Sequence, residues 1–144
     1  MTKLFRATET VRSVEEIDYA RLLDEGKRVL LFDLDNTLCK RAATHLSDRL
    51  RAFLIARSDM GFDIGILTNR RRNAQDPIIH ALAELVPILT AAGKPSRRGF
   101  QKLLARMGAS AEHAVMIGDR KLTDILGANR TGLHSIRVTR KSRK

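Results

Sequence analysis

The chain has few of the residues that mark disulfide-rich, secreted or membrane-spanning proteins. Its 144 residues include one cysteine, Cys39, three prolines, no tryptophan and 4% aromatic residues. A single cysteine excludes an intrachain disulfide framework and fits a reducing compartment. No segment approaches the ~20 consecutive apolar residues of a membrane-spanning helix, and residues 1–6 lack the apolar core of a secretory signal. We therefore expect a cytoplasmic protein, soluble or peripheral at a membrane surface.

What the chain has in excess is positive charge. Its 27 Lys and Arg residues outnumber 16 Asp and Glu residues, so the formal net charge is +11. This excess favours anionic partners such as phosphate esters, nucleic acid or an acidic lipid surface, with general solubility as the alternative. The 43% apolar fraction suffices for one folded domain. We expect a single domain over residues 1–144, with an N-terminal extension (1–12) and a disordered basic tail (139–144).

Short apolar runs alternate with helical patterns along the whole chain. We expect strands at residues 29–34, 62–67, 86–89, 114–117 and 134–138, and helices that begin near Ser13, Ser47, Asp76, Ser96 and Leu122. This order predicts an α/β fold, a doubly wound, Rossmann-like five-stranded parallel sheet with helices on both faces. Pro87 places the third strand at a sheet edge. Residues 38–47 and 69–94 are too short to hold a separate cap domain.

Polar side chains follow these strands at the point where each strand ends. Asp33 and Asp35 come after the first strand, where two buried anions are costly unless a cation or a reaction compensates them. Later strand ends and the loops beyond them carry Thr68 and Asn69, Lys94, Gly118 and Asp119, and Asp124. Ligands of open α/β sheets bind at this carboxyl edge, so we expect these groups to converge there.

Such a set of side chains suits phosphoryl transfer. One carboxylate can attack phosphorus and form an aspartyl-phosphate, while a second protonates the leaving group and later accepts a proton from water. A hydroxyl and a lysine can bind the phosphoryl oxygens. The carboxylates suit Mg²⁺, which prefers oxygen ligands.

The segments DLDNTL, TN, KP and GDxxxTD resemble the four signature motifs of the haloacid dehalogenase (HAD) superfamily of phosphatases. The resemblance implies that Asp33 is the nucleophile and Asp35 the general acid and base. It implies phosphate binding by Thr68, Asn69 and Lys94. It also implies a Mg²⁺ site formed by Asp33, the backbone carbonyl of Asp35 and Asp119, with Asp124 and Gly118 in support.

A closer similarity, over residues 11–138, is to the YqeG-type branch of HAD subfamily IIIA, which includes phosphatidylglycerophosphate phosphatases. It is densest after Lys94. The chain departs from these relatives at residues 39–43 and at Arg120. Both departures fall at the expected substrate mouth, so they bear on substrate identity more than on chemistry.

Ten basic residues follow the predicted strand ends and would form a basic rim around the site: Lys40, Arg41, Arg70, Arg71, Arg72, Lys94, Arg97, Arg98, Arg120 and Lys121. A rim of this kind attracts phosphorylated substrates or anionic membranes, although charge is also common in loops. Near the N-terminus, Leu4, Phe5, Val11 and Val14 are interleaved with Lys3, Arg6 and Arg12. This segment is either a short interfacial anchor or a part of the chain that packs on the domain.

We therefore expect a Mg²⁺-dependent phosphomonoester hydrolase that acts through an aspartyl-phosphate, on an anionic lipid phosphate such as phosphatidylglycerophosphate. One alternative is a phosphatase for a nucleic-acid end, a nucleotide or a sugar phosphate. Another is a non-catalytic basic module that binds RNA or a ribosomal particle. The intact acidic motif argues against the last, and the absence of clustered aromatic residues weighs against single-strand binding.

Overall fold

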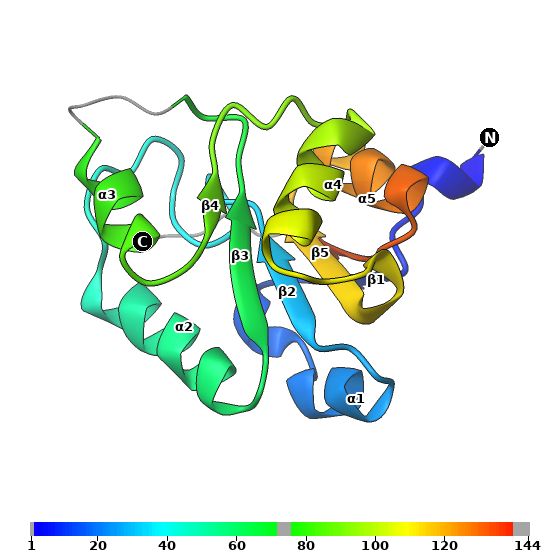
Figure 1. Cartoon of the computed structure of the whole chain (residues 1–144), viewed down its shortest axis with the longest axis horizontal. Helices are drawn as coiled ribbons and strands as arrows, with labels where there is room; N and C mark the ends of the chain where they lie inside the picture. The colour runs from blue at the N-terminus through cyan, green and yellow to red at the C-terminus, as the bar shows by residue number, and fades with distance from the viewer. Residues whose placement is uncertain (1, 72–75, 140–144) are drawn as a thin grey trace.

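The computed structural model describes residues 2–71 and 76–139. Six strands form one sheet in the order β1-β6-β5-β2-β3-β4, and every neighbouring pair is parallel (Figure 1). The strands are β1 (Glu9–Val11), β2 (Val29–Phe32), β3 (Asp63–Leu67), β4 (Ile88–Leu89), β5 (Ala114–Gly118) and β6 (His134–Val138). The predicted α/β class, the doubly wound arrangement and the edge position of β4 are confirmed. The basic tail at 140–144 and Arg72 lie outside the described residues.

The predicted count of five strands is wrong, because β1 adds a sixth within residues 1–12. Its Thr10 pairs with Arg137 of β6 at the edge of the sheet. Just before β1, Thr8 and Ser135 exchange hydrogen bonds, with Thr8 N donating to Ser135 Oγ at 3.0 Å and Ser135 N donating to Thr8 Oγ1 at 3.1 Å. A three-residue strand is too short to produce a periodic apolar pattern, so the sequence carried no clear signal for it.

Helices cover both faces of the sheet because alternate residues of the buried strands point to opposite sides. In β2, Leu30 and Phe32 pack with side chains of α1 (Tyr19–Asp24), α2 (Asp48–Asp59) and α3 (Pro77–Ala83). Val29 and Leu31 pack on the other face with α4 (Arg97–Arg106) and α5 (Leu126–Thr131). Figure 1 shows α2 and α3 on one side and α4 and α5 on the other. In the described parts of the chain, no helix is long and apolar enough to cross a membrane.

Most helix starts follow the capping residues that the sequence predicts. Ser47 Oγ accepts a hydrogen bond from Leu50 N at 3.1 Å, and Ser96 Oγ accepts one from Arg98 N at 3.3 Å. Ser13, by contrast, precedes only the 3₁₀ turn η2 (Val14–Glu16) and makes no side-chain cap. The helix α1 starts later, where the Asp18 carboxylate accepts from Arg21 N.

Three further short segments complete the described fold: the 3₁₀ turns η1 (Thr2–Phe5) and η3 (Ala111–His113), and the π-helical turn η4 (Lys121–Ile125). The helix expected near Leu122 begins with η4, which runs directly into α5. Chain direction along the sheet reverses beside β2, since the chain passes to β3 and β4 on one side and returns to β5 and β6 on the other. The crevice at such a switch point is where α/β sheets bind ligands.

Candidate active site

The two leading aspartates are placed by β2 and by a tight turn after it. Asp33 extends the sheet by one residue, because its backbone N donates to Ile117 O of β5 at 2.9 Å. The chain then turns around Leu34, whose carbonyl accepts from Leu38 N at 3.0 Å. Asn36 takes a left-handed conformation with φ of 62°, which asparagine tolerates better than most residues. After this turn, Asp35 lines the same pocket as Asp33.

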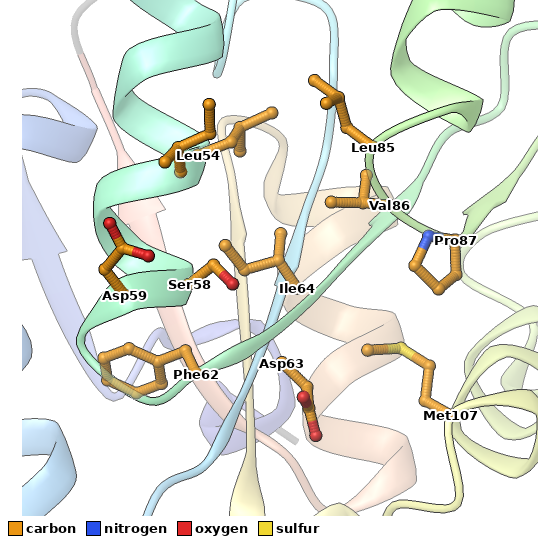
Figure 2. A pocket seen from close by; sticks show the side chains of 11 residues that line it. Leu54, Ser58, Asp59, Phe62, Asp63, Ile64, Leu85, Val86, Pro87 and Met107 are labelled. Carbon is orange, nitrogen blue, oxygen red and sulfur yellow. The ribbon is translucent and has the colours of Figure 1, made fainter.

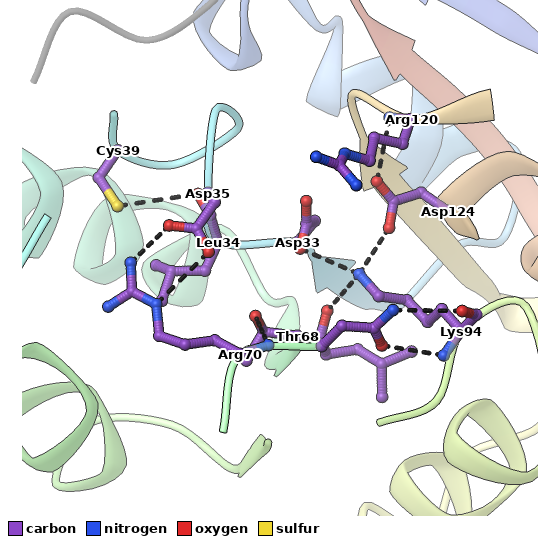
Figure 3. A network of polar contacts seen from close by, with 11 residues as sticks. Asp33, Leu34, Asp35, Cys39, Thr68, Arg70, Lys94, Arg120 and Asp124 are labelled. Atoms are coloured by element: carbon purple, nitrogen blue, oxygen red, sulfur yellow. Dashed lines mark hydrogen bonds and ion pairs between the residues drawn. The ribbon is translucent and has the colours of Figure 1, made fainter. Parts of the chain in front are cut away.

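Lys94 connects the acidic residues beneath this edge (Figure 3). Its buried ammonium donates to Asp33 Oδ1 at 2.9 Å and to Asp124 Oδ1 at 2.5 Å. A third hydrogen bond, to Leu67 O at 2.9 Å, uses its remaining donor. Burial lowers the pKa of Lys94, but the charges of Asp124 and Asp33 outweigh that effect and raise it above its ordinary value. Lys94 therefore stays in its charged form, and its three hydrogen bonds fix the orientation of the ammonium group.

Three carboxylates meet around this lysine. Asp33, Asp119 and Asp124 each offer an oxygen, and these oxygens lie within 4.8 Å of one another. Burial, together with the negative charge of Asp124, raises the pKa of Asp33 to about 7 against the opposing charge of Lys94. Burial and then Asp124 also raise the pKa of Asp119. Three carboxylates facing one ammonium leave an excess of two negative charges when all are ionised. Such an all-oxygen set fits a divalent cation.

Gly118 makes room for the most deeply buried of these acids. Asp124 is fully buried, and its Oδ2 accepts a hydrogen bond from Arg120 N at 3.2 Å. A Cβ atom on Gly118 would collide with the Asp124 carboxylate. Only glycine at the end of β5 therefore allows Asp124 to reach Lys94 and the other acids.

Asp35 lies apart from this cluster, in an ion pair that the sequence did not reveal. Arg70 Nη2 contacts Asp35 Oδ1 at 2.5 Å, and Arg70 Nη1 contacts Asp76 Oδ2 at 3.1 Å. Ala42 N also donates to Asp35 Oδ1. Burial raises the pKa of Asp35, but the hydrogen bonds from Arg70 and Ala42 outweigh it, so the pKa lies below its ordinary value. Asp35 is therefore held as a carboxylate.

The residues after β3 form the opposite wall of the site. Thr68 is buried, and its Oγ1 accepts from Arg70 N at 3.0 Å, which leaves the hydroxyl proton available for an anion. The Asn69 side chain instead pairs with the backbone of Lys94: its Oδ1 accepts from Lys94 N at 2.9 Å and its Nδ2 donates to Lys94 O at 3.2 Å. Asn69 thus ties the Lys94 loop to β3.

Most of the residues that the sequence selected line one open pocket of about 140 Å³. Asp33, Asp35, Thr68, Asn69 and Lys94 all contribute to it, and Asp119 and Asp124 adjoin it through the acidic cluster. The wall also includes Asn36, Arg41, Arg70, Arg120 and Thr123. The pairing of Arg70 with Asp35 was not predicted. The sequence shows a basic residue directly after Thr68 and Asn69, but it contains no signal that pairs this residue with Asp35.

A larger hollow, of about 400 Å³, opens near the amino-terminal ends of β3 and β4 (Figure 2). Its lining is mainly apolar and includes Phe62, Ile64 and Val86, and its charged members are Asp59 and Asp63. Acidic side chains repel an anionic ligand, and the lining holds no Lys or Arg. The smaller pocket at the carboxyl edge is therefore the better candidate for the chemistry.

The fold and this pocket together fit the HAD-type phosphatase that the sequence motifs predict. A family model described as HAD-hydrolase-like matches residues 91–143. The probable phosphatase YqeG of Bacillus subtilis (strain 168) is 29% identical over 138 residues, which cover 96% of this chain and 79% of that protein. These matches confirm the resemblance to HAD-type phosphatases of the YqeG-like kind that the sequence motifs predict, and they support a phosphoric monoester hydrolase.

Two further similarities extend this result. The chloroplastic phosphatidylglycerophosphate phosphatase 1 of Chlamydomonas reinhardtii is 31% identical over 132 residues. The match covers 87% of this chain but only 49% of the relative, so the chain spans about half of that protein. The crystal structure of an uncharacterized protein from Listeria monocytogenes serotype 4b superposes with a TM-score of 0.63 over 78% of each chain, at 23% identity. This likeness establishes the shared fold.

Proposed function

We propose that the chain hydrolyses phosphomonoesters through an aspartyl-phosphate on Asp33, with Mg²⁺ as its metal. The observation that carries this proposal is the Lys94 ammonium, which contacts Asp33 at 2.9 Å and lies in the same cluster as Asp119 and Asp124. Asp33, Asp119 and the backbone carbonyl of Asp35 would hold the ion, with Asp124 in support. When bound, the ion supplies positive charge that lowers the repulsion between an anionic nucleophile and an anionic phosphate.

The first half-reaction transfers the phosphoryl group to the protein. An Asp33 carboxylate oxygen attacks phosphorus, and the bond from phosphorus to the leaving oxygen breaks. Asp35 donates a proton to that oxygen, while the Thr68 hydroxyl binds a non-bridging oxygen. Lys94 binds another by exchanging one of its three present acceptors for the phosphoryl oxygen. Because Arg70 favours the carboxylate form of Asp35, this step requires the ion pair to loosen as substrate enters.

The second half-reaction releases phosphate. Water attacks phosphorus, Asp35 accepts a proton from the water, and the bond from phosphorus to the Asp33 oxygen breaks. Here the carboxylate form of Asp35 is the form that the chemistry needs. The ion pair between Arg70 and Asp35 therefore favours the protonation state that the second half-reaction needs, whereas it opposes the state that the first half-reaction needs.

The substitution Asp33→Asn tests the nucleophile. We expect it to abolish phosphate release from an aryl phosphate in the presence of Mg²⁺, while the matched change Asp63→Asn, at an exposed position in β3, leaves the rate unchanged. A variant that retains activity would show that Asp33 is not the nucleophile. A wild-type protein that is inactive with every divalent metal would favour the non-catalytic binding module instead.

For the substrate, we propose an anionic lipid phosphate such as phosphatidylglycerophosphate. Support comes from the named activity of the chloroplast relative, from the open pocket, and from the exposed basic residues Lys40, Arg41, Arg71, Arg120 and Lys121 on nearby loops. The test compares phosphate release from phosphatidylglycerophosphate vesicles with release from 5′- and 3′-phosphorylated oligonucleotides and from sugar phosphates. Rapid hydrolysis of an oligonucleotide without hydrolysis of the lipid would refute the lipid assignment.

A further inference from the structure

Three exposed apolar side chains lie on two turns, η1 and η4, that pack against each other, and η4 borders the pocket. Leu4 and Phe5 of η1 are 40% and 37% exposed, and Leu122 of η4 is 67% exposed. The turn η1 packs against both η4 and α5, so these side chains belong to one surface region. Figure 1 places η1 at the end of the molecule toward which the strands point. Large apolar side chains that share a surface next to a functional site commonly mark an interaction site.

Asn129 of α5 holds η1 in place. Its Nδ2 donates to Leu4 O at 2.9 Å and to Arg6 O at 2.8 Å, and its Oδ1 accepts from Ser135 Oγ at 2.8 Å. These bonds fix the backbone and leave the side chains of Leu4 and Phe5 outward. A binding surface that is already ordered loses less conformational entropy when it binds a partner.

Positive charge surrounds these apolar side chains. Lys3, Arg6, Arg120 and Lys121 are exposed, and neither residues 2–7 nor residues 120–123 include an acidic residue. Leucine and phenylalanine that alternate with basic residues are typical of segments that lie in the interface of an anionic bilayer. Nucleic acid fits less well, because a base-stacking surface needs several aromatic rings, and Phe5 is the single aromatic residue in these two segments.

The same turn connects this surface to the active site. Arg120 and Thr123 line the pocket that contains Asp33 and Lys94, while Leu122 between them faces outward. A membrane that contacts Leu122 would therefore lie at the mouth of the pocket.

We propose that Leu4, Phe5 and Leu122, with Lys3, Arg6, Arg120 and Lys121, form a membrane-docking face that presents the pocket to an anionic bilayer. This inference rests on the proposed lipid-phosphate substrate and assigns the surface that recognises the lipid phase. The affinity is modest and reversible, because three partly exposed side chains provide little apolar area. Electrostatic attraction to anionic headgroups supplies much of the binding, so binding weakens as salt concentration rises.

Vesicle sedimentation with the full chain tests the apolar part of the face. We expect the protein to bind vesicles of phosphatidylglycerol and phosphatidylcholine, and to bind vesicles of phosphatidylcholine alone much less. The double variant Leu4→Ser, Leu122→Ser should lower the partition coefficient by roughly tenfold, given the usual gain from burying part of a leucine side chain. The matched variant Ile55→Ser, at a 47% exposed position of α2, should bind as the wild type does.

Two further variants test charge and order. Lys3→Gln with Arg6→Gln should lower partitioning at low salt by about fivefold per charge, whereas Lys102→Gln on α4 should not. Asn129→Ala keeps every side chain of the docking face but removes the bonds that hold η1, and it should weaken binding. Circular dichroism checks that each variant is folded.

Hydrolysis of a soluble aryl phosphate separates this proposal from the proposed function. If the wild type hydrolyses the aryl phosphate but ignores anionic vesicles, the docking face is refuted and the phosphatase stands. If vesicle binding depends on Leu4 and Leu122 while no phosphate is released, the docking face stands and the catalytic proposal fails. Binding that survives the leucine changes, or equal binding to a phosphorylated oligonucleotide that the same changes abolish, would overturn the membrane assignment.

Discussion

Replacing Lys94 with methionine tests the electrostatic design of the site most directly. Methionine has similar length but no charge, so Lys94→Met removes the ammonium with little change in packing. The Lys94 side chain is 2% exposed, and the side chains of its partners Asp33 and Asp124 are 10% and 0% exposed. The variant would leave two buried carboxylates without their shared partner.

The expected loss of stability is large. Breaking a buried ion pair by removing one partner typically costs about 3–5 kcal/mol, and for a chain of this size each kcal/mol corresponds to roughly 2–4 °C in Tm. We therefore expect the metal-free variant to melt roughly 10 °C or more below the wild type at pH 8. The loss should be smaller at pH 5, because the raised pKa of Asp33 allows this carboxyl to be protonated there, which removes part of the uncompensated charge. Activity should fall by about 10²–10³-fold, as for the loss of one preorganised donor to a developing anion.

Differential scanning calorimetry and aryl phosphate hydrolysis measure these two effects. The control is Lys102→Met, an exposed lysine of α4, which should change neither Tm nor rate appreciably. Added Mg²⁺ should raise the Tm of Lys94→Met more than that of the wild type, because the cation restores positive charge next to the same carboxylates. A variant with wild-type Tm at both pH values would refute the view that Lys94 compensates a buried negative cluster.

Three further outcomes follow from the pKa shifts. Burial raises the pKa of Asp33 from 3.8 to about 7, so the folded metal-free protein binds that proton more tightly than the unfolded chain does. The difference in unfolding free energy between the wild type and Asp33→Asn, measured by urea titration, should therefore fall as pH rises from 4 to 7. Burial also raises the pKa of the Cys39 thiol to about 12, so iodoacetamide should label it at pH 8 only after denaturation, and rapid labelling of the native protein would contradict its buried position. Arg70→Met should raise the pKa of Asp35, and the alkaline limb of the pH profile of kcat/KM, which reports the protonated acid, should move to higher pH. An unchanged alkaline limb would contradict the role of Asp35 as the general acid.

The sequence predicted the carboxyl edge of the sheet well because its signals there are local. The run 29–32 is apolar at every position, which indicates a strand buried on both faces, and Asp33 follows it directly. The Ser47 and Ser96 caps likewise depend on residues two or three positions apart. Parallel strands then bring distant motifs to one edge, so Asp33, Lys94 and Asp124 could be placed together without knowledge of any side-chain contact.

The features that the sequence did not predict depend on pairs of side chains far apart in the chain. Arg70 contacts Asp35 across 35 residues, and Asn129 contacts the backbone of Leu4 across 125 residues. Neither residue type predicts its partner, because arginine and asparagine side chains form hydrogen bonds with many different groups. Ser13 was misread for the opposite reason: its pattern with Glu16 matches a local capping motif, but the chain forms only a 3₁₀ turn there before Asp18 starts α1.

The charge distribution explains why we expect a chain with a net charge of +11 to need a cation at its active site. Several of its exposed basic residues, among them Lys40, Arg41, Arg71, Arg120 and Lys121, lie on loops near the pocket. At and beside the pocket, three carboxylates lie close to one ammonium. A phosphate attracted by the basic loops therefore encounters negatively charged carboxylates at the point where Asp33 must approach phosphorus. The loops raise the local concentration of an anionic substrate, but they cannot neutralise charge inside the cluster, where Lys94 has already used all three of its donors. When all three carboxylates are ionised, the remaining negative charge is balanced from outside the chain, and a divalent cation held by Asp33 and Asp119 would match it in sign and in magnitude.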